Sequence, residues 1–192
     1  ARVYKENPEE VLVSVHSDHW MNSDKKFATL IRKSAKIASS YPDHTILIGI
    51  KPTYPETGYG YICLDKKVVQ QKFSNLYKVK QFIEKPDLRR ANKFVGQKKY
   101  LWNPGWFAWR VDHLLSLYKK HLRNNYQVIE SIANAPARSF QRVVNKEFPK
   151  LKPATIDYGI LERTKKRLVL PTDIGWTDIG HWRSVAEMSK QD

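Results

Sequence analysis

The sequence predicts an α/β fold in which a mixed, mainly parallel sheet is flanked by helices. Short runs rich in β-branched residues, such as Val11–Val15 and Thr45–Ile50, are typical of strands buried on both faces. Between them, apolar residues recur every three or four positions from about residue 23 to 39, which indicates an amphipathic helix. The order strand, helix, strand predicts a parallel β-α-β unit.

The remaining elements follow from the same patterns. Lys51–Gly60 contains two prolines and two glycines, which predicts a loop with fixed turns. We expect further strands over residues 61–64, 77–83, 105–111 and 167–170. We expect helices over residues 88–95, from 112 onward, in two or three segments of 124–148, over 155–162, and from 181 onward. The expected helix caps are Asp87, Asp112 and Thr155.

Composition limits the class of protein. The chain has 192 residues, of which 41% are hydrophobic, so it can bury a core, and no linker or repeat divides it. Its one cysteine, Cys63, cannot form an internal disulfide, and its strand-like surroundings predict a small buried residue. No apolar stretch is long enough for a bilayer, and residues 1–6 lack a signal-peptide core. We therefore expect a cytoplasmic protein without a membrane partner.

The formal net charge of +15 attracts polyanions in general. The basic residues are scattered, however, and form neither a basic helix nor an arginine-rich tract. A solvated basic surface therefore explains the charge better than a nucleic-acid face, and we do not expect a nucleic-acid partner. A nucleic-acid-binding module stays as an alternative that rests on the charge alone.

Four loops next to predicted strands combine rigid turn residues with isolated polar groups. They are Ser17–His19, Thr57–Gly60, Glu84–Pro86 with Trp102–Gly105, and Gly175–Gly180. Ligands bind beyond the carboxyl ends of strands in such sheets, and Asp18 follows the first strand there. Each loop alone is a weak signal, because an aspartate after a strand is often a helix cap and Gly-Tyr-Gly is often only a turn.

Together, five motifs in order resemble the sugar-1-phosphate nucleotidyltransferases, a family with a GT-A-like, Rossmann-like fold. They are PTYPETGYGYI (52–62), FIEKP (82–86), WNPGWF (102–107), IDYGILE (156–162) and GWTDIGHW (175–182). TGYGYI, WNPGWF and IDYGILE are similar to the mannose-1-phosphate guanylyltransferase branch. The resemblance covers most of the chain and implies transfer of a nucleotidyl group from GTP to mannose 1-phosphate, which gives GDP-mannose and pyrophosphate.

The resemblance also implies a divalent cation, expected to be Mg²⁺, because both substrates are polyanions that repel each other. Mg²⁺ binds few carboxylates together with phosphate oxygens and water. Asp18 stands in the place of the family's strand-end aspartate, and Asp178 lies in its Trp-x-Asp-x-Gly pattern. Both are therefore expected as metal ligands and catalytic residues. The structural alternative for Asp178 is a cap on a helix that begins at Gly180.

Sugar-phosphate contacts are implied by the same motifs. Lys85 is expected to supply a positive charge for the sugar phosphate in catalysis, and no residue has the setting of a covalent nucleophile. The other residues implied at the sugar are Gly58, Tyr59, Glu84, Asn103 and Asp157. The alternative to sugar binding is a turn-forming role for Asn103 and a purely structural role for Asp157. Trp176 and Trp182 are expected to pack rather than to stack on a substrate.

One family motif is absent from the sequence. The family begins with a strand and a Gly-rich, Arg-containing loop that holds the NTP phosphates, and nothing in residues 1–192 resembles it. We therefore expect an N-terminally truncated sheet with an exposed apolar edge. Residues 1–192 would be the C-terminal portion of a single nucleotidyltransferase domain, and this portion should not catalyse turnover alone.

Two other functions stay open at the sequence level. One is transfer from UTP or dTTP to glucose 1-phosphate, and the other is a non-catalytic domain that binds a sugar nucleotide or a partner subunit as a regulator. The retained acidic residues and Lys85 weigh against a regulator, which has no need of metal ligands. The sequence also leaves open a homo-oligomer and a C-terminal isomerase domain.

Overall fold

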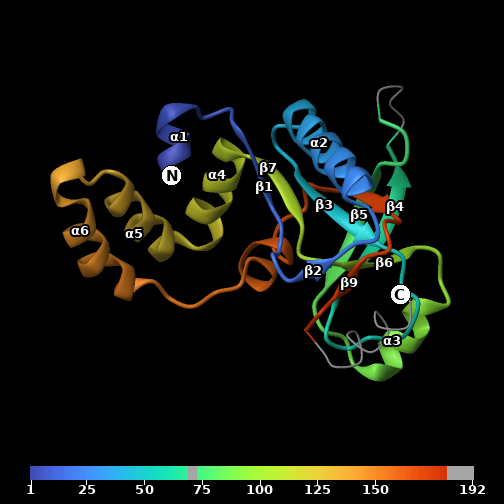
Figure 1. Cartoon of the computed structure of the whole chain (residues 1–192). Helices are drawn as coiled ribbons and strands as arrows, with labels where there is room; N and C mark the ends of the chain where they lie inside the picture. Colours follow the sequence, from blue (N-terminus) through green and yellow to red (C-terminus); the bar gives the residue numbers. More distant parts are fainter. Residues whose placement is uncertain (69–72, 181–192) are drawn as a thin grey trace.

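The computed structural model describes residues 1–68 and 73–180, so the helix expected from His181 onward lies outside the described residues (Figure 1). The strands are β1 (Val11–Ser14), β2 (His19–Trp20), β3 (Thr45–Ile50), β4 (Gly60–Lys67), β5 (Tyr77–Ile83), β6 (Tyr100–Asn103), β7 (Phe107–Arg110), β8 (Arg167–Thr172) and β9 (Thr177–Asp178). The helices are α1 (Arg2–Glu6), α2 (Asp24–Ser40), α3 (Leu88–Val95), α4 (Val111–His121), α5 (Arg123–Ala133) and α6 (Phe140–Glu147). Short turns are the 3₁₀ segments Ala137–Ser139 and Phe148–Lys150 and the π-helical turn η3 (Asp157–Leu161).

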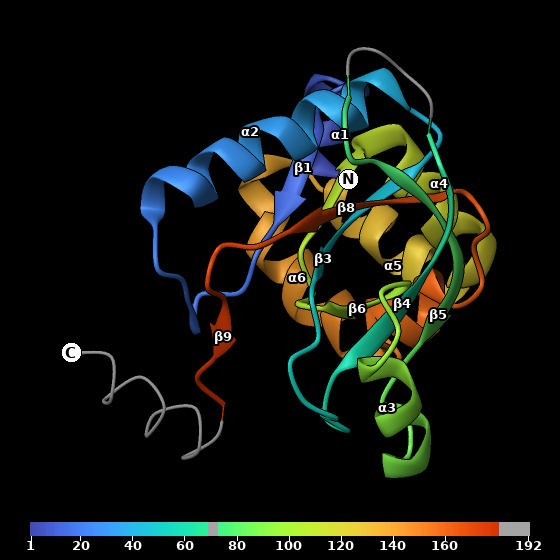
Figure 2. The same cartoon turned by 90° about the vertical axis from the view of Figure 1, so that its right-hand side faces the viewer.

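The main sheet of the described residues has seven strands in the order β1-β7-β3-β6-β4-β5-β8. An additional pairing joins β8 back to β3, so β3, β6, β4, β5 and β8 form a closed circuit of paired strands (Figure 2). The strands β6 and β7 both pair with β3, at its end and near its start, respectively. A separate ribbon of two residues on each side joins β2 to β9.

The prediction of a mainly parallel sheet was wrong. Among the described strands of the main sheet, β3 and β8 form the one parallel pair, and the other pairs are antiparallel. The predicted β-α-β unit does contain two strands that run the same way, because β1 and β3 are both antiparallel to β7. The antiparallel strand β7 lies between them. The antiparallel neighbours β4 and β5 are joined by a connection that is too short for the crossover helix that parallel neighbours need.

The core lies on both faces of the sheet, which explains the continuous apolar runs. On one face, Leu30 and Ile37 of α2 pack with Ile46 and Ile48 of β3. The alternate residue, Leu47, points to the other face and packs in a second cluster, which Leu114 of α4 joins. A third cluster packs α3 against the ends of β4, β5 and β6. Continuous apolar composition thus indicated burial on two faces correctly, but did not indicate strand direction.

Helix boundaries agree closely with the sequence. Ser23 caps α2 by accepting from the Lys26 amide, and Asp87 caps α3 by accepting from the Arg90 amide at 2.8 Å. The capping role expected of Asp112 was wrong, because α4 begins at Val111 and the Asp112 carboxylate binds the guanidinium of Arg110. A charge-assisted bond to a neighbouring arginine is stronger than a bond to one amide.

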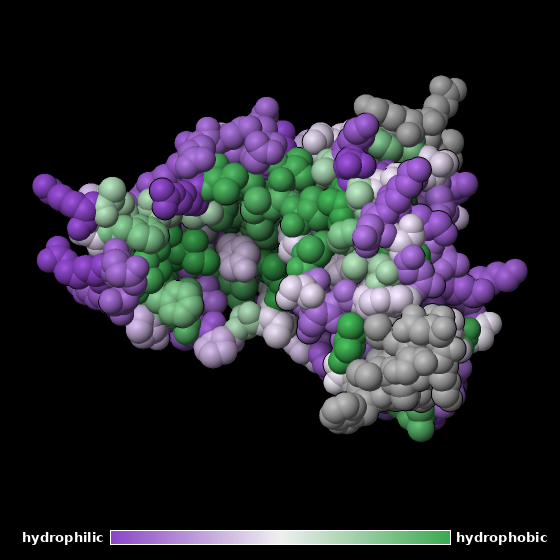
Figure 3. All heavy atoms as spheres, in the orientation of Figure 1, coloured by the Kyte–Doolittle hydropathy of each residue, from purple (hydrophilic) through white to green (hydrophobic). Residues whose placement is uncertain are grey.

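The strand β1 forms one end of the sheet order and pairs with β7 alone among the described residues. In the part of the chain that the structure describes, its other edge has no strand beside it, and Val15, which follows it, is 46% exposed. Figure 3 shows hydrophobic residues gathered on this face of the molecule, between the helical lobe of α4, α5 and α6 and the sheet. The exposed apolar edge expected from the sequence is therefore present in the described chain.

Within the described part of the chain, Cys63 is buried, as expected. None of the helices in this part is long and apolar enough to cross a membrane.

Candidate active site

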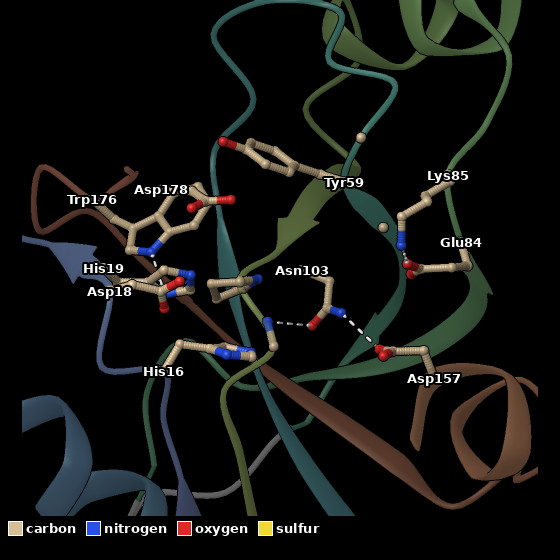
Figure 4. Close-up of a pocket in the computed structure, with 14 residues that line it drawn as sticks. His16, Asp18, His19, Tyr59, Glu84, Lys85, Asn103, Asp157, Trp176 and Asp178 are labelled. Atoms are coloured by element: carbon tan, nitrogen blue, oxygen red, sulfur yellow. Dashed lines mark hydrogen bonds and ion pairs between the residues drawn. The ribbon is translucent and has the colours of Figure 1, made fainter. Parts of the chain in front are cut away.

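One pocket of about 300 Å³ lies beyond the ends of several strands and loops. It is lined by His16, Asp18, His19, Gly58, Tyr59, Gly60, Glu84, Lys85, Asn103, Pro104, Gly105, Asp157, Trp176 and Asp178. All eight site residues named from the sequence are among them, drawn from six separate segments of the chain (Figure 4). The structure therefore brings the predicted residues together, while their chemical roles stay predictions.

The ribbon of β2 and β9 brings the two aspartates to the same side of the pocket. His19 pairs with Asp178 across the ribbon, and the amide of Ile179 approaches the carbonyl of Asp18 at 3.5 Å. The Asp178 carboxylate accepts the amide of Gly180 at 2.9 Å, while the helix that it was alternatively expected to cap lies outside the described residues. Asp18 is exposed and Asp178 half-buried, so their carboxylate oxygens can face a ligand in the pocket.

His19 is held by two tryptophans. The indole N–H of Trp106 donates to Nδ1 of His19 at 3.0 Å, and the indole N–H of Trp176 donates to the same atom at 3.1 Å. His16 stacks obliquely on His19 with ring centroids 4.8 Å apart. Burial is the main cause that lowers the pKa of His19, followed by the nearby His16.

Glu84 and Lys85 form an ion pair at the opposite wall of the pocket. The ammonium of Lys85 donates to Oε1 of Glu84 at 2.5 Å. The Glu84 side chain is 7% exposed, and its other oxygen, Oε2, is buried without a hydrogen-bond partner among the described residues. Burial therefore raises the pKa of Glu84, while hydrogen bonding to Glu84 raises that of Lys85. A carboxylate oxygen buried without a partner is energetically costly, so this wall of the pocket holds an unsatisfied acceptor.

The backbone at Lys85 is strained. Its φ is +43°, in the left-handed region that favours glycine, although the next residue is Pro86. Such a conformation costs about 1–3 kcal/mol and is found mostly at functional sites. In this case it directs the ammonium back onto Glu84, at the pocket wall.

Asn103 and Asp157 join the loop after β6 to the π-helical turn η3. The Asn103 amide donates to Oδ1 of Asp157 at 3.1 Å and accepts the amide of Gly105 at 3.2 Å. The turn-forming alternative for Asn103 is therefore part of its bonding, and one N–H remains for a ligand. Burial raises the pKa of Asp157. The turn η3 takes the place of the helix expected over 155–162, and π-helical turns are frequent at functional sites.

Tyr59 and the glycines around it form the roof of the pocket. The Tyr59 ring is buried and packs edge-on against Trp102 and Trp176, with centroids 5.4 Å apart in both cases. Gly60 lies against Glu84, since a Cβ atom at residue 60 would be 2.5 Å from Oε2. Gly58 is exposed, and its amide donates to the carboxylate of Glu56 at 2.7 Å.

Sequence reasoning missed the roles of His16, Gly60 and Trp106, and it assigned Trp176 to packing only. Trp176 does pack, but its N–H also fixes His19. The available signal was the pair of tryptophans that follow glycines at the edges of two motifs, Gly105-Trp106 and Gly175-Trp176, where the glycines have φ of +73° and +62°. A left-handed glycine precedes each indole that donates to His19.

The charge of the pocket differs from that of the whole chain. Among the described residues its lining holds four carboxylates and one lysine, although the chain as a whole carries a net charge of +15. A phosphorylated ligand would meet more negative than positive charge there, and a cation beside it would offset that repulsion. Asp18 and Asp178 offer the hard oxygen donors that Mg²⁺ prefers, and the donor set therefore fits that ion.

Comparison with known proteins agrees with this geometry. A family model described as nucleotidyl transferase matches residues 1–192. The chain belongs to the nucleotidyl transferase family. The likeness inferred from the five motifs is thus confirmed.

Two relatives align with nearly the whole length of this chain. A mannose-1-phosphate guanylyltransferase from Escherichia coli is 34% identical over 191 residues, which cover 97% of this chain and 40% of that protein. A protein of the same name from Salmonella muenchen is 33% identical, with 99% of this chain and 39% of the relative covered. This nucleotidyl transferase chain therefore spans about two fifths of the length of these relatives.

Solved structures confirm an α/β nucleotidyltransferase fold with a mixed sheet. The crystal structure of a mannose-1-phosphate geranyltransferase from Thermus thermophilus matches with a TM-score of 0.84 at 26% identity. The match covers 100% of this chain and 53% of that one. A mannose-6-phosphate isomerase structure from Helicobacter pylori has a TM-score of 0.71 at 22% identity, over 90% of this chain and 65% of that one, and it supports the fold alone.

Proposed function

We propose that this chain carries the sugar-phosphate and metal half of an enzyme that transfers the nucleotidyl group of GTP to mannose 1-phosphate. The observation that carries the proposal is the convergence of eight family-motif residues on one acidic pocket with a single lysine. The names of the relatives support mannose 1-phosphate and GTP over glucose 1-phosphate with UTP or dTTP.

In this proposal each residue has a role that follows from its chemistry. The buried acceptor of Glu84 and the free N–H of Asn103 would bind sugar hydroxyls, since both still have bonding capacity. Lys85 would contact the phosphate and orient its oxygen for attack on the α-phosphorus of GTP, and Gly58, Tyr59 and Asp157 would shape the sugar site. Asp18 and Asp178 would hold Mg²⁺, which supplies positive charge against the phosphates.

The nucleotide half of the site is proposed to lie outside residues 1–192. A strand supplied beside the open edge of β1 would extend the sheet and could present a loop of backbone amides to the GTP phosphates. In this proposal the sheet is of the GT-A-like, Rossmann-like kind. A cytoplasmic location, a single domain and assembly into a homo-oligomer complete the proposal.

Calorimetric titration tests the sugar and metal half directly. GDP-mannose and mannose 1-phosphate would be titrated into the protein with and without Mg²⁺, with GDP-glucose and UDP-glucose as controls. We expect binding that prefers the mannosyl compounds and depends on Mg²⁺. The variants D18N and D178N should lose the Mg²⁺ dependence, while D65N, which changes an exposed carboxylate of β4, should keep it.

Other results would point to the other functions. Equal binding of UDP-glucose and GDP-mannose would contradict the choice of substrates. Mannosyl binding that is indifferent to Mg²⁺ and to D178N would favour a regulatory domain without catalysis.

A further inference from the structure

Three loops of the pocket meet at one atom, Nδ1 of His19. Trp106 belongs to the connection between β6 and β7, and Trp176 precedes β9 by one residue. Each indole N–H donates to Nδ1, at 3.0 and 3.1 Å. An indole N–H has no lone pair to offer and is a donor only. Nδ1 must therefore be the unprotonated nitrogen, and in a neutral imidazole the proton then lies on Nε2.

His19 also belongs to a group of side chains that could bind a metal ion. The ligand atoms of His16, Asp18 and His19 lie within 4.8 Å of one another, which makes the three residues a candidate metal cluster in the described chain. Two imidazole nitrogens and one carboxylate are a donor set that suits Zn²⁺ or Ni²⁺. A cluster of this kind would compete with the hard, oxygen-ligated cation that Asp18 and Asp178 would hold.

The hydrogen bonds of His19 have the wrong polarity for a metal ligand. A ligating histidine normally donates its second N–H to a carboxylate, a carbonyl or water, and this donation raises the basicity of the ligating nitrogen. In the present site both outer partners of His19 are donors. To coordinate through Nε2, the imidazole would have to lose that proton and become an anion. To coordinate through Nδ1, it would have to break both indole bonds.

We propose that Trp106 and Trp176 fix His19 as its Nε2–H tautomer and thereby exclude it from metal coordination, so that the site selects an oxygen-ligated divalent cation against Zn²⁺ and Ni²⁺. His19 is then a positioning residue that acts through its neighbours. It follows Asp18 in the chain, pairs with Asp178 across the ribbon, and is joined by Trp176 to the segment that carries Asp178. The selectivity for Mg²⁺ rests on the proposed function, while the tautomer does not.

The first test reads the tautomer of the unmodified protein by NMR of the ¹⁵N-labelled histidine rings, without metal, sugar or nucleotide. We expect the His19 signals to show an unprotonated Nδ1 and a protonated Nε2. Addition of Zn²⁺ at a concentration equal to that of the protein should leave both signals unchanged. A protonated Nδ1, or a shift of both ring nitrogens on addition of Zn²⁺, would overturn the proposal.

The second test removes the donors and keeps the rings. In W106F or W176F one donor remains on Nδ1, so each single variant should retain the tautomer. In the double variant Nδ1 is released, and we expect affinity for Zn²⁺ to rise about 10- to 100-fold, the range over which outer-shell partners alter metal binding. The changes in affinity for Zn²⁺ of the two single variants should therefore sum to much less than the change in the double variant. Unchanged affinity for Zn²⁺ in the folded double variant would contradict the proposal.

W109F is the matched control. It removes an indole bond of similar length, 3.1 Å, but to Thr45 instead of His19, so neither the tautomer nor zinc affinity should change. The NMR of the unmodified protein decides the question even if the double variant does not fold. Failure of the proposed function would appear separately, as an intact Nε2–H tautomer in a protein that binds neither mannose 1-phosphate nor Mg²⁺.

Discussion

Replacement of Glu84 by glutamine should make the protein more stable and less able to bind its sugar substrate. Oε2 of Glu84 is buried without a partner, and a buried polar atom left unsatisfied costs about 1–3 kcal/mol, more when it is charged. Glutamine removes that charge and also the like charge that Asp157 faces. The loss is the ion pair to Lys85, whose side chain is 56% exposed, so it stabilises by at most about 1 kcal/mol.

The net gain expected for E84Q is about 1 kcal/mol, which raises Tm by about 2–4 °C in a chain of this size. The gain should depend on pH. Burial raises the pKa of Glu84 above its ordinary 4.5, so below pH 4.5 the carboxyl is protonated in both states and its full contribution to stability is present. That contribution is lost as pH rises through the folded-state pKa. The Tm advantage of E84Q should therefore be small at pH 4 and largest at pH 7–8.

Thermal unfolding from pH 4 to pH 8 and titration with mannose 1-phosphate measure the two effects. Because Glu84 would accept a ligand hydroxyl as a charged group, a bond worth about 1.5–3 kcal/mol, affinity should fall about 10- to 100-fold. E6Q, at an exposed carboxylate of α1, should change neither quantity. A lower Tm for E84Q at pH 7, or the same gain at pH 4 and pH 7, would refute the reasoning.

Three further predictions follow from other contacts. G60A should cost about 1–3 kcal/mol in unfolding free energy and weaken sugar binding, because its Cβ would lie 2.5 Å from a carboxylate oxygen of Glu84. G96A is the control and should be neutral, because a Cβ at residue 96 would meet no atom within 4 Å. D18N and D178N should each lower Mg²⁺-dependent turnover of the complete enzyme by about 10²–10³-fold, equivalent to several kcal/mol, and unchanged turnover would exclude them as metal ligands. The ion pair with Lys166 and the bond to His44 lower the pKa of Asp43 from 3.8 to about 2. D43N should therefore lose up to about 1 kcal/mol of unfolding free energy above pH 4, measured by denaturant unfolding, and this loss should shrink as pH falls through the folded-state pKa.

The sequence predicted most of the elements, because local signals determine them, but it indicated no helix at α1 and no strand at β6. The bounds of β3, β5 and α3 agree with the predicted ranges residue for residue, since each is enclosed by a cap, a proline or a polar turn. Strand direction was not predictable in the same way, because a run such as Thr45–Ile50 is equally apolar whether its neighbour is parallel or antiparallel. Pairing partners such as β7 and β1 are distant in sequence, and no local pattern specifies them.

The site was predicted through motifs, and its connections were not. Family-motif reasoning found Asp18, Glu84 and Asp178, which all line the pocket. It did not find the bonds that place them, such as those from two indoles to His19, because they join residues up to 157 positions apart. The ribbon of β2 and β9 escaped notice for the same reason, since two residues on each side are too few to form a pattern.

That ribbon has a consequence for the order in which the protein assembles. A pairing so short contains few backbone hydrogen bonds, each worth about 0.5–1.5 kcal/mol, yet it closes a loop of nearly the whole described chain. During synthesis the acidic end of the pocket cannot form until residue 178 has emerged. In the finished protein the ribbon should be among the first segments to exchange its amide hydrogens. A cation held by Asp18 and Asp178 would slow that exchange by mass action. Its binding free energy would thus stabilise the ribbon at a late stage of folding.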